Sequence, residues 1–257
     1  MVDKDVLIEI DSVSLSFPGN NAYPLVVFKN LSLDIRRGEF VAIVGPSGCG
    51  KTSLLKLVGD LLQLTEGTIL IGGHTPREAR KNREFSFVFQ NPVLLPWLTV
   101  RKNVELAGEI FRDSEVRSRA QEFINLVGLD GFENAYPNHL SGGMQSRVAI
   151  ARALTFNPKV LLMDEPFADL DELTRFRMNM ELLRVWHNQK PTILFVTHSL
   201  REAVFLADSV VVLGPRPSQI QEIFEIYLSR PRKIEVTETP QFTSYVRKLR
   251  EKLQIEL

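Results

Sequence analysis

One run of eight residues limits the folds open to this chain more than any other feature: Gly45-Pro46-Ser47-Gly48-Cys49-Gly50-Lys51-Thr52. It fits the pattern G-x-x-x-x-G-K-[ST]. The continuous apolar stretch before it, Phe40–Val44, is typical of a strand buried on both faces. The apolar-periodic stretch after it, Ser53–Asp60, predicts a helix. These flanking elements disfavour a chance match in a glycine-bearing turn.

The chemistry of this phosphate loop suits the binding of ATP and Mg²⁺. Its glycines let the backbone wrap closely around phosphate groups, and the following helix, which includes Ser53, places its positive end at the same spot. Lys51 would reach the β- and γ-phosphates, and the hydroxyl group of Thr52 would bind Mg²⁺. We therefore expect residues 45–53 to bind a nucleotide.

A second candidate site is the apolar stretch Val160–Met163, which is followed by Asp164 and Glu165. A carboxylate at the end of a buried strand can hold Mg²⁺ through its water ligands, and this role suits Asp164. Glu165, one residue on, points elsewhere and can polarise an attacking water. The alternative is an ordinary strand followed by an acidic turn, which the phosphate loop in the same chain disfavours.

Short apolar or alternating stretches predict further strands, with turns at 18–21 and 36–39. These strand candidates are Val6–Ile10, Val13–Phe17, Leu31–Ile35, Thr68–Ile71, Phe85–Phe89, Thr192–Val196 and Val210–Leu213. Strands that alternate with helices imply a parallel sheet. From about 91 to 156 the pattern is mostly helical. One helical face there carries Val116, Ala120, Phe123, Ile124 and Val127.

The predicted fold class is α/β. We expect a phosphate-loop NTPase core with a mostly parallel sheet, an N-terminal antiparallel β subdomain and an inserted α-helical subdomain. The predicted domains are an ATPase domain over 1–230, whose helical subdomain covers about 91–156, and a short C-terminal helical extension over 231–257.

Composition narrows the class of partner. The chain has 257 residues with 31 basic and 31 acidic side chains, and this balance gives no support to a nucleic-acid partner. No apolar run approaches the roughly 18 residues of a membrane span. The N-terminal residues 1–5 lack the basic-then-apolar build of a signal peptide. Cys49 is the only cysteine, so no internal disulfide can form.

The run Leu140-Ser141-Gly142-Gly143-Met144-Gln145, followed by the helical pattern Ser146–Leu154, resembles the signature of ABC-type ATPases. Ser141 stands where a helix N-cap would be, and the two glycines allow close approach of another molecule. The run therefore predicts a second helix end that can bind an anion. The resemblance, which covers nearly the whole chain, implies that Ser141, Gly142, Gly143 and Gln145 close on the ATP held by a second ATPase subunit.

The same resemblance implies roles for residues outside these runs. Phe17 matches the aromatic position that stacks on adenine, with Tyr23 as the rival. Gln90 matches the glutamine that touches both Mg²⁺ and the attacking water. His198 matches the switch histidine that contacts the γ-phosphate. Ala168-Asp169-Leu170-Asp171 matches the crossing loop, which reaches the other subunit beside the catalytic site, and Asp171 is expected to contact the nucleotide there.

Two departures from the family pattern stand out. Relatives usually carry Ser-Ala or Gly-Ala where this chain has Ala168-Asp169, and Asp169 adds a negative charge near the expected dimer interface. Cys49 occupies a variable position of the phosphate loop. It is either a small filler or a thiol whose alkylation would block ATP.

Three motifs that are less specific than the signature resemble the nitrate/sulfonate/taurine type of bacterial importer, which also includes bicarbonate systems. They are the runs 90–100, 198–208 and Arg230-Pro231-Arg232. The resemblance implies a homodimer or a pair with a close homologue, transmembrane permease subunits, an extracytoplasmic solute-binding protein, and a peripheral location on the cytoplasmic face of the inner membrane. An ATPase of an exporter or lipid-trafficking system, and a soluble ABC ATPase that acts outside transport, remain the alternatives.

Overall fold

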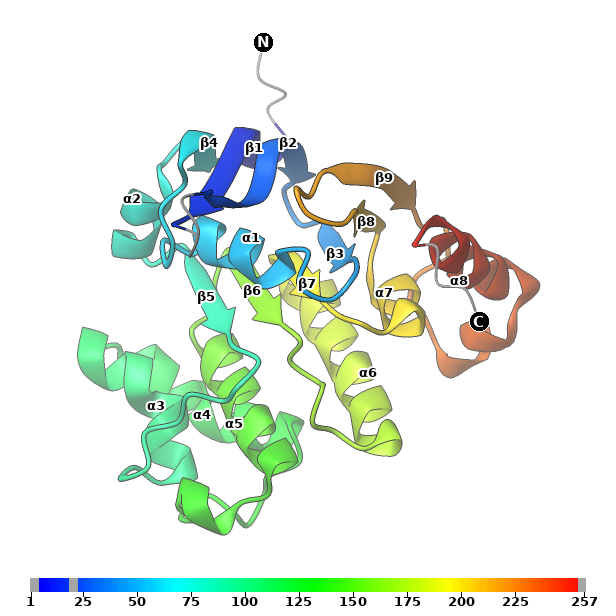
Figure 1. Cartoon of the computed structure of the whole chain (residues 1–257). Coiled ribbons are helices and arrows are strands. Elements are labelled where there is room, and N and C mark those ends of the chain that lie inside the picture. The colour runs from blue at the N-terminus through cyan, green and yellow to red at the C-terminus, as the bar shows by residue number, and fades with distance from the viewer. Residues whose placement is uncertain (1–4, 19–22, 254–257) are drawn as a thin grey trace. The chain divides into compact units, whose positions relative to one another are not determined.

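The structure is a computed structural model, and it describes residues 5–18 and 23–253. The described chain divides into two compact units (Figure 1). Unit 1 comprises Met1–Phe85 and Pro191–Leu257, and unit 2 comprises Ser86–Lys190. The N-terminal residues 1–4 and most of the predicted turn at 18–21 lie outside the described residues. No helix among the described residues is long and apolar enough to cross a membrane.

Unit 1 begins with an antiparallel three-stranded sheet in the order β2-β1-β4. Its strands are β1 (Val6–Phe17), β2 (Leu25–Arg36) and β4 (Glu66–Ile71). A short helix with a capping box, α2 (Pro76–Lys81), follows β4. The predicted antiparallel sheet at the N-terminus is therefore present.

The second sheet of unit 1 has the strand order β7-β3-β8-β9. Its strands are β3 (Phe40–Val44), β7 (Thr192–Val196), β8 (Ser209–Leu213) and β9 (Ile220–Glu225). β3 is parallel to both β7 and β8, whereas β9 is antiparallel to β8. Every residue of β3, β7 and β8 is buried, as their continuous apolar sequences predict.

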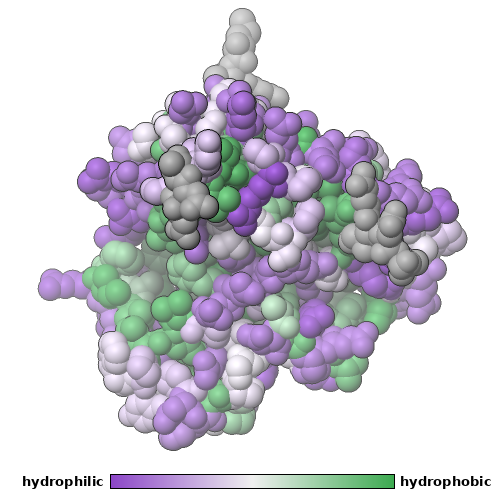
Figure 2. Space-filling model, in the orientation of Figure 1, coloured by the Kyte–Doolittle hydropathy of each residue, from purple (hydrophilic) through white to green (hydrophobic). Residues whose placement is uncertain are grey.

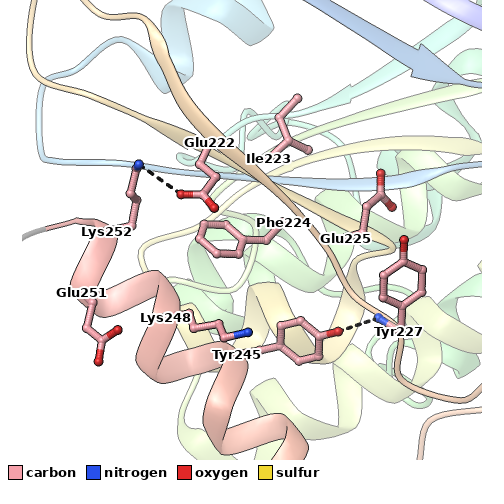
Figure 3. Close-up of a pocket in the computed structure, with 9 residues that line it drawn as sticks. All are labelled: Glu222, Ile223, Phe224, Glu225, Tyr227, Tyr245, Lys248, Glu251 and Lys252. Carbon is pink, nitrogen blue, oxygen red and sulfur yellow. Dashed lines mark hydrogen bonds and ion pairs between the residues drawn. The ribbon is translucent and has the colours of Figure 1, made fainter.

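Three more helices of unit 1 lie outside the first sheet. They are α1 (Lys51–Val58), α7 (Leu200–Leu206) and α8 (Pro240–Lys252), and a 3₁₀ turn, η2 (Ile234–Glu238), precedes α8. The groove between β9 and α8 is open to solvent (Figure 3). α8 confirms the expected helix near the C-terminus.

Unit 2 contains two neighbouring strands and four helices. The strands are β5 (Phe85–Val88), which begins at the unit boundary, and β6 (Val160–Asp164). The helices are α3 (Val100–Phe111), α4 (Ser114–Leu126), α5 (Gly142–Thr155) and α6 (Glu172–Gln189), with a 3₁₀ turn η1 (Pro137–His139). α3, α4 and α5 pack against one another within the segment predicted to be helical. The domain boundaries at 91, 156 and 230 stay predictions.

Three sequence predictions need correction. Val6–Ile10 and Val13–Phe17 form one strand, β1, because an irregularity at Ser12, whose φ is 51°, shifts the register and interrupts the alternation. The predicted helix Ser53–Asp60 begins at Lys51 and ends at Val58, because Gly50 turns the chain directly into α1 and Gly59 caps it. β9 was not predicted, because an exposed edge strand carries little apolar pattern.

Candidate nucleotide-binding site

The phosphate loop joins β3 to α1 in a conformation that requires glycine. Gly50 is the N-cap of α1 with φ 111°, and a Cβ added there would lie 2.6 Å from Cγ1 of Val27. A Cβ added to Gly45 would lie 2.9 Å from the carbonyl oxygen of Leu213. The loop therefore packs directly on neighbouring strands, and no larger residue fits at these two positions.

Lys51 is buried at the start of α1, with only 5% of its surface exposed. Its Nζ donates hydrogen bonds to the carbonyl oxygens of Gly45 at 2.9 Å and Pro46 at 3.1 Å. An ammonium group has three protons to donate, and these two bonds hold the charge beside the loop. This position suits an ion pair with phosphate groups cradled by the loop and by the N-terminus of α1.

The loop between β8 and β9 holds the phosphate loop through hydrogen bonds to its backbone carbonyl groups. Sequence analysis did not predict this contact. Arg216 Nε donates to the carbonyl oxygen of Gly48, and Ser218 Oγ donates to that of Cys49. Ser218 is fully buried, and its backbone N–H donates to the carbonyl oxygen of Val27 at 2.7 Å. The run 214–218 has the composition of a turn, and this was the one sequence signal in the region. No local pattern could indicate that this turn contacts a loop about 170 residues earlier.

His198 and the phosphate loop emerge at the same edge of the sheet. Each follows the carboxyl end of its strand, and the two strands, β7 and β3, are parallel neighbours with Val196 opposite Ile43. Ligands of α/β proteins bind at this kind of edge. The His198 side chain is exposed, as contact with a phosphate would require. Unit 1 therefore brings two of the predicted nucleotide-binding features together.

Phe17 is the last residue of β1, where it lies opposite Leu25 of β2 and is half-buried. Tyr23, the rival aromatic residue, is 83% exposed. Both side chains belong to unit 1, and the stacking of either one on adenine stays a prediction.

In unit 2 the ends of β5 and β6 bring Gln90 and Glu165 together. The Gln90 Nε2 donates a hydrogen bond to Oε2 of Glu165 at 3.4 Å. Asp164 ends β6 and is 2% exposed. Glu165 adopts φ 47°, a left-handed conformation that is uncommon outside glycine and that tends to occur at functional sites. This geometry suits a carboxylate that orients a water molecule.

The predicted signature lies at the N-terminus of α5. Ser141 is the N-cap, and its Oγ accepts a hydrogen bond from the backbone N–H of Met144 at 3.3 Å. Ser141 and Gly142 are exposed, so this helix end is open to another molecule. Gln145 is engaged within the chain, because its Nε2 donates to the carbonyl oxygens of Pro137 and Leu140. Contact of Gln145 with a nucleotide stays a prediction.

The crossing loop 168–171 packs against this signature. A Cβ added to Gly143 would lie 3.1 Å from Cδ2 of Leu170 and 3.3 Å from the carbonyl oxygen of Asp169. Asp171 is the N-cap of α6. Its carboxylate accepts hydrogen bonds from Thr174, and these lower the pKa of the Asp171 carboxyl group. Asp171 therefore has a structural role within the chain, and its predicted contact with the nucleotide stays a prediction.

The predicted Mg²⁺ ligands divide between the units: Thr52 belongs to unit 1, and Gln90 and Asp164 to unit 2. Among residues 5–18 and 23–253, no group of three or more His, Cys, Asp or Glu could hold a metal ion. Mg²⁺ commonly binds through one or two carboxylates, substrate phosphates and water. The buried carboxylate of Asp164 and the hydroxyl group of Thr52 are donors of the kind that Mg²⁺ accepts, so the residues fit this ion.

Cys49 is 1% exposed, and burial raises the pKa of its thiol above the usual 9.0, although Lys51 acts in the opposite direction. Because the thiolate is the reacting form, we expect iodoacetamide to label the folded protein slowly at pH 7 and faster only as the pH rises beyond 9. Mass spectrometry of this single-cysteine chain measures the rate. Protein unfolded in urea is the control, and equal labelling rates for folded and unfolded protein would show that the thiol is not protected.

Comparison with known proteins places the chain among nucleotide-binding subunits of transporters. Residues 28–168 match the family model described as ABC transporter. The chain is 48% identical over 218 residues to an uncharacterized ABC transporter ATP-binding protein of Methanocaldococcus jannaschii, covering 84% of this chain and 80% of the relative. It is 41% identical over 225 residues to the aliphatic sulfonates import ATP-binding protein of Bacillus cereus, covering 88% of each.

Solved structures show the same fold. One is described as the dimeric structure of a bacterial ABC transporter cassette, and it is 33% identical with a TM-score of 0.77. A second, described as a post-hydrolysis state of an ATP-binding cassette bound to ADP and Pi, is 32% identical with a TM-score of 0.78. Each likeness covers 87% of this chain and 100% of the other. The predicted phosphate-loop NTPase fold is thereby confirmed.

Proposed function

Because the chain belongs to the ABC transporter family and is an ATPase of that family, we propose that its ATP hydrolysis drives the import of a small solute through a membrane permease. The solute we propose is an anion such as nitrate, a sulfonate, taurine or bicarbonate. The chain would lie on the cytoplasmic face of the inner membrane as a peripheral subunit. An extracytoplasmic solute-binding protein would deliver the solute.

The observation that carries the ATPase assignment is the arrangement at the edge of the unit 1 sheet. The phosphate loop and His198 follow two parallel neighbouring strands, and Lys51 is already held beside the loop by two carbonyl oxygens. Lys51 would bind the β- and γ-phosphates of ATP, and His198 would contact the γ-phosphate. Mg²⁺, held through Thr52, Asp164 and Gln90, would neutralise the phosphate charge.

Unit 2 supplies the groups for attack by water. Glu165 would accept a proton from the attacking water as the phosphate is transferred. Gln90 already donates a hydrogen bond to Oε2 of this carboxylate and would hold the same water molecule in place. Glu165 directly follows β6, and Gln90 lies two residues after the neighbouring strand β5, so these two strands position both residues.

The open N-terminus of α5 supports the proposal that the protein works as a pair. Ser141 and Gly142 are exposed and offer a second anion-binding helix end in the same chain. We propose that they close on ATP bound by a second ATPase subunit, either an identical chain or a close homologue. The similar cassette that is described as dimeric supports this arrangement.

The proposed direction is import. The relatives of Bacillus cereus and of Bacillus thuringiensis subsp. konkukian, which are 41% and 43% identical, are both described as aliphatic sulfonates import ATP-binding proteins. The importer-like runs 90–100, 198–208 and 230–232 point in the same direction. A sulfonate is therefore the first solute to test.

The segment 91–99 of unit 2 is the proposed docking surface for the permease. Asn103 is fully buried and fixes this segment, because its Nδ2 donates to the carbonyl oxygens of Leu95, Leu98 and Thr99 at 3.0–3.1 Å. Trp97 is nevertheless 69% exposed. Figure 2 shows hydrophobic side chains gathered at the left of the lower half of the view, where Figure 1 labels α3. A rigid segment with an exposed aromatic side chain suits a protein partner.

Coexpression with the partner permease subunits tests the proposal. In proteoliposomes that contain the solute-binding protein, we expect one of the four proposed anions to stimulate ATP hydrolysis and to accumulate. Trp97→Ser should release most of the subunit from the permease, because hot-spot aromatic residues contribute about 2 kcal/mol or more to binding.

Exposed Tyr136→Ser, also in unit 2, is the matched control and should stay bound. Accumulation on the opposite side of the membrane would contradict import. Unchanged permease binding by Trp97→Ser would contradict the docking surface.

A further inference from the structure

Two arginine side chains from the C-terminal part of the chain cap the end of α7. The last carbonyl groups of any helix lack partners within the helix. Here Arg232 Nη1 donates to the carbonyl oxygens of Val204 at 3.2 Å, Phe205 at 3.0 Å and Ala207 at 2.7 Å. Arg230 Nη2 donates to the remaining one, that of Leu206, at 2.8 Å. Four successive carbonyl oxygens therefore lie within hydrogen-bond distance of Arg230 and Arg232, and because Nη1 of Arg232 has two protons, it shares them among its three acceptors.

Arg232 is an unusual cap because it is 3% exposed. Its Nη2 also donates to the carbonyl oxygen of Ile226 at 3.3 Å. Burial lowers the pKa of Arg232 to about 9, with Arg230 contributing in the same direction, so the guanidinium remains charged at neutral pH. A positive charge at the C-terminal end of a helix is stabilised by the helix dipole.

Arg230 connects the same cap to the strand that precedes the phosphate loop. Its Nε and Nη2 donate to Oδ1 of Asp208 at 2.9 and 2.7 Å. Oδ2 of Asp208 accepts a hydrogen bond from the backbone N–H of Phe40, the first residue of β3, at 3.0 Å. The cap is therefore continuous with the sheet that carries the phosphate loop.

At its other end α7 begins directly after His198. Ser199 is the N-cap, and its Oγ accepts a hydrogen bond from the backbone N–H of Glu202 at 3.3 Å. Thr197 Oγ1 donates to the buried carboxylate of Glu202 and accepts from the backbone N–H of Ser199. These contacts enclose His198 between two residues that are tied to the first turn of α7.

α7 has only seven residues, and a helix of this length does not persist on its own in water. Its position, and that of His198 at its start, must therefore come from packing and from caps at both ends. Arg201 on α7 contacts the tail directly, because its guanidinium lies 5.2 Å from the ring centroid of the buried Phe242 on α8.

α8 is itself anchored to β9. Tyr245 accepts a hydrogen bond from the backbone N–H of Tyr227 at 3.1 Å, and Lys252 forms an ion pair with Glu222 at 3.1 Å (Figure 3). The two contacts lie at opposite ends of the open groove between β9 and α8. The segment 226–252 therefore holds α7 through side chains that are fixed at several points.

We propose that Arg232, assisted by Arg230, is a positioning residue for His198: the C-terminal segment fixes the helix that follows the switch histidine and thereby sets how strongly the site prefers ATP to ADP. This inference rests on the proposed contact between His198 and the γ-phosphate. The proposed role in nucleotide recognition thus belongs to a segment that is separate in sequence from the phosphate loop, the signature and His198.

The test compares the dissociation constants of ATP and ADP in protein that carries Glu165→Gln to slow hydrolysis. Their ratio reports recognition of the γ-phosphate. We expect His198→Ala and Arg232→Gln each to reduce the preference for ATP by about tenfold, because small misplacements of a contacting group have effects of this size or larger. When both changes are combined, no further loss is expected, because residues that act through one another are not additive.

Arg247→Gln is the matched control, since this arginine is exposed on α8 and forms an ion pair with Glu251. It should leave the ratio unchanged. An unchanged ratio in Arg232→Gln, or losses that add in the double variant, would overturn the positioning role. An unchanged ratio in His198→Ala would instead overturn the role of His198, and the positioning proposal would fall with it.

Arg232→Lys and Arg230→Gln cover the case in which Arg232→Gln does not fold. Lysine keeps the charge but lacks the planar set of donors, so it should retain part of the preference for ATP. Arg230→Gln, at a less buried position, should lower the ratio in the same direction, and hydrogen exchange should speed up at the amides of α7. A normal ratio in both folded variants would overturn the proposal.

Discussion

The Glu165→Gln variant is expected to bind ATP normally and to lose nearly all ATP turnover. A glutamine side chain matches glutamate in shape but cannot accept a proton from the attacking water. General-base groups typically contribute about 10²- to 10⁴-fold to a rate, so turnover should fall by that factor. Phosphate release measured with saturating Mg-ATP, beside a separate measurement of ATP affinity, distinguishes the lost chemistry from lost binding.

The matched control for this substitution is Glu172→Gln, an exposed glutamate in the first turn of α6, seven residues further along. It should keep the wild-type rate. Undiminished turnover in Glu165→Gln would refute the assignment of the base. The bond from Gln90 and the left-handed backbone at Glu165 would then need another explanation.

Lys51→Ala should remove most of the affinity for ATP. The substitution deletes a buried ammonium group that is held by the carbonyl oxygens of Gly45 and Pro46. A hydrogen bond to a charged group contributes about 1.5–3 kcal/mol, which corresponds to about 10- to 150-fold in the dissociation constant. Titration with a fluorescent ATP analogue measures this change.

Lys56→Ala is the control for that experiment, because Lys56 lies in the last turn of the same helix. It should change ATP affinity little. Thermal unfolding of both variants checks that the fold is retained. Unchanged nucleotide binding by folded Lys51→Ala would count against the phosphate loop as the binding site.

Sequence patterns predicted the parts of the fold that are encoded locally. The continuous apolar runs Phe40–Val44 and Thr192–Val196 match β3 and β7 residue for residue, because a strand buried on both faces needs no polar positions. The phosphate loop and the signature were found because each needs particular residues at fixed spacing. Glu165 was found because two acids follow an apolar strand, whereas Gln90 was found through the family resemblance.

The features that sequence analysis missed depend on contacts between distant parts of the chain. Arg216 and Ser218 brace a loop about 170 residues away, and Arg232 caps a helix that ends about 25 residues before it. No local pattern distinguishes such an arginine from one on the surface. β1 was divided in two because the irregularity at Ser12 changes which positions face the core.

Light scattering of Glu165→Gln, with and without Mg-ATP, tests the central claim that two copies share bound ATP. We expect the mass of one chain without nucleotide and twice that mass with Mg-ATP. Adding Ser141→Arg should keep ATP binding but leave the protein as single chains, because the open end of α5 would be blocked. Single chains of Glu165→Gln with ATP bound, or an ATP-dependent pair that Ser141→Arg leaves intact, would contradict the account.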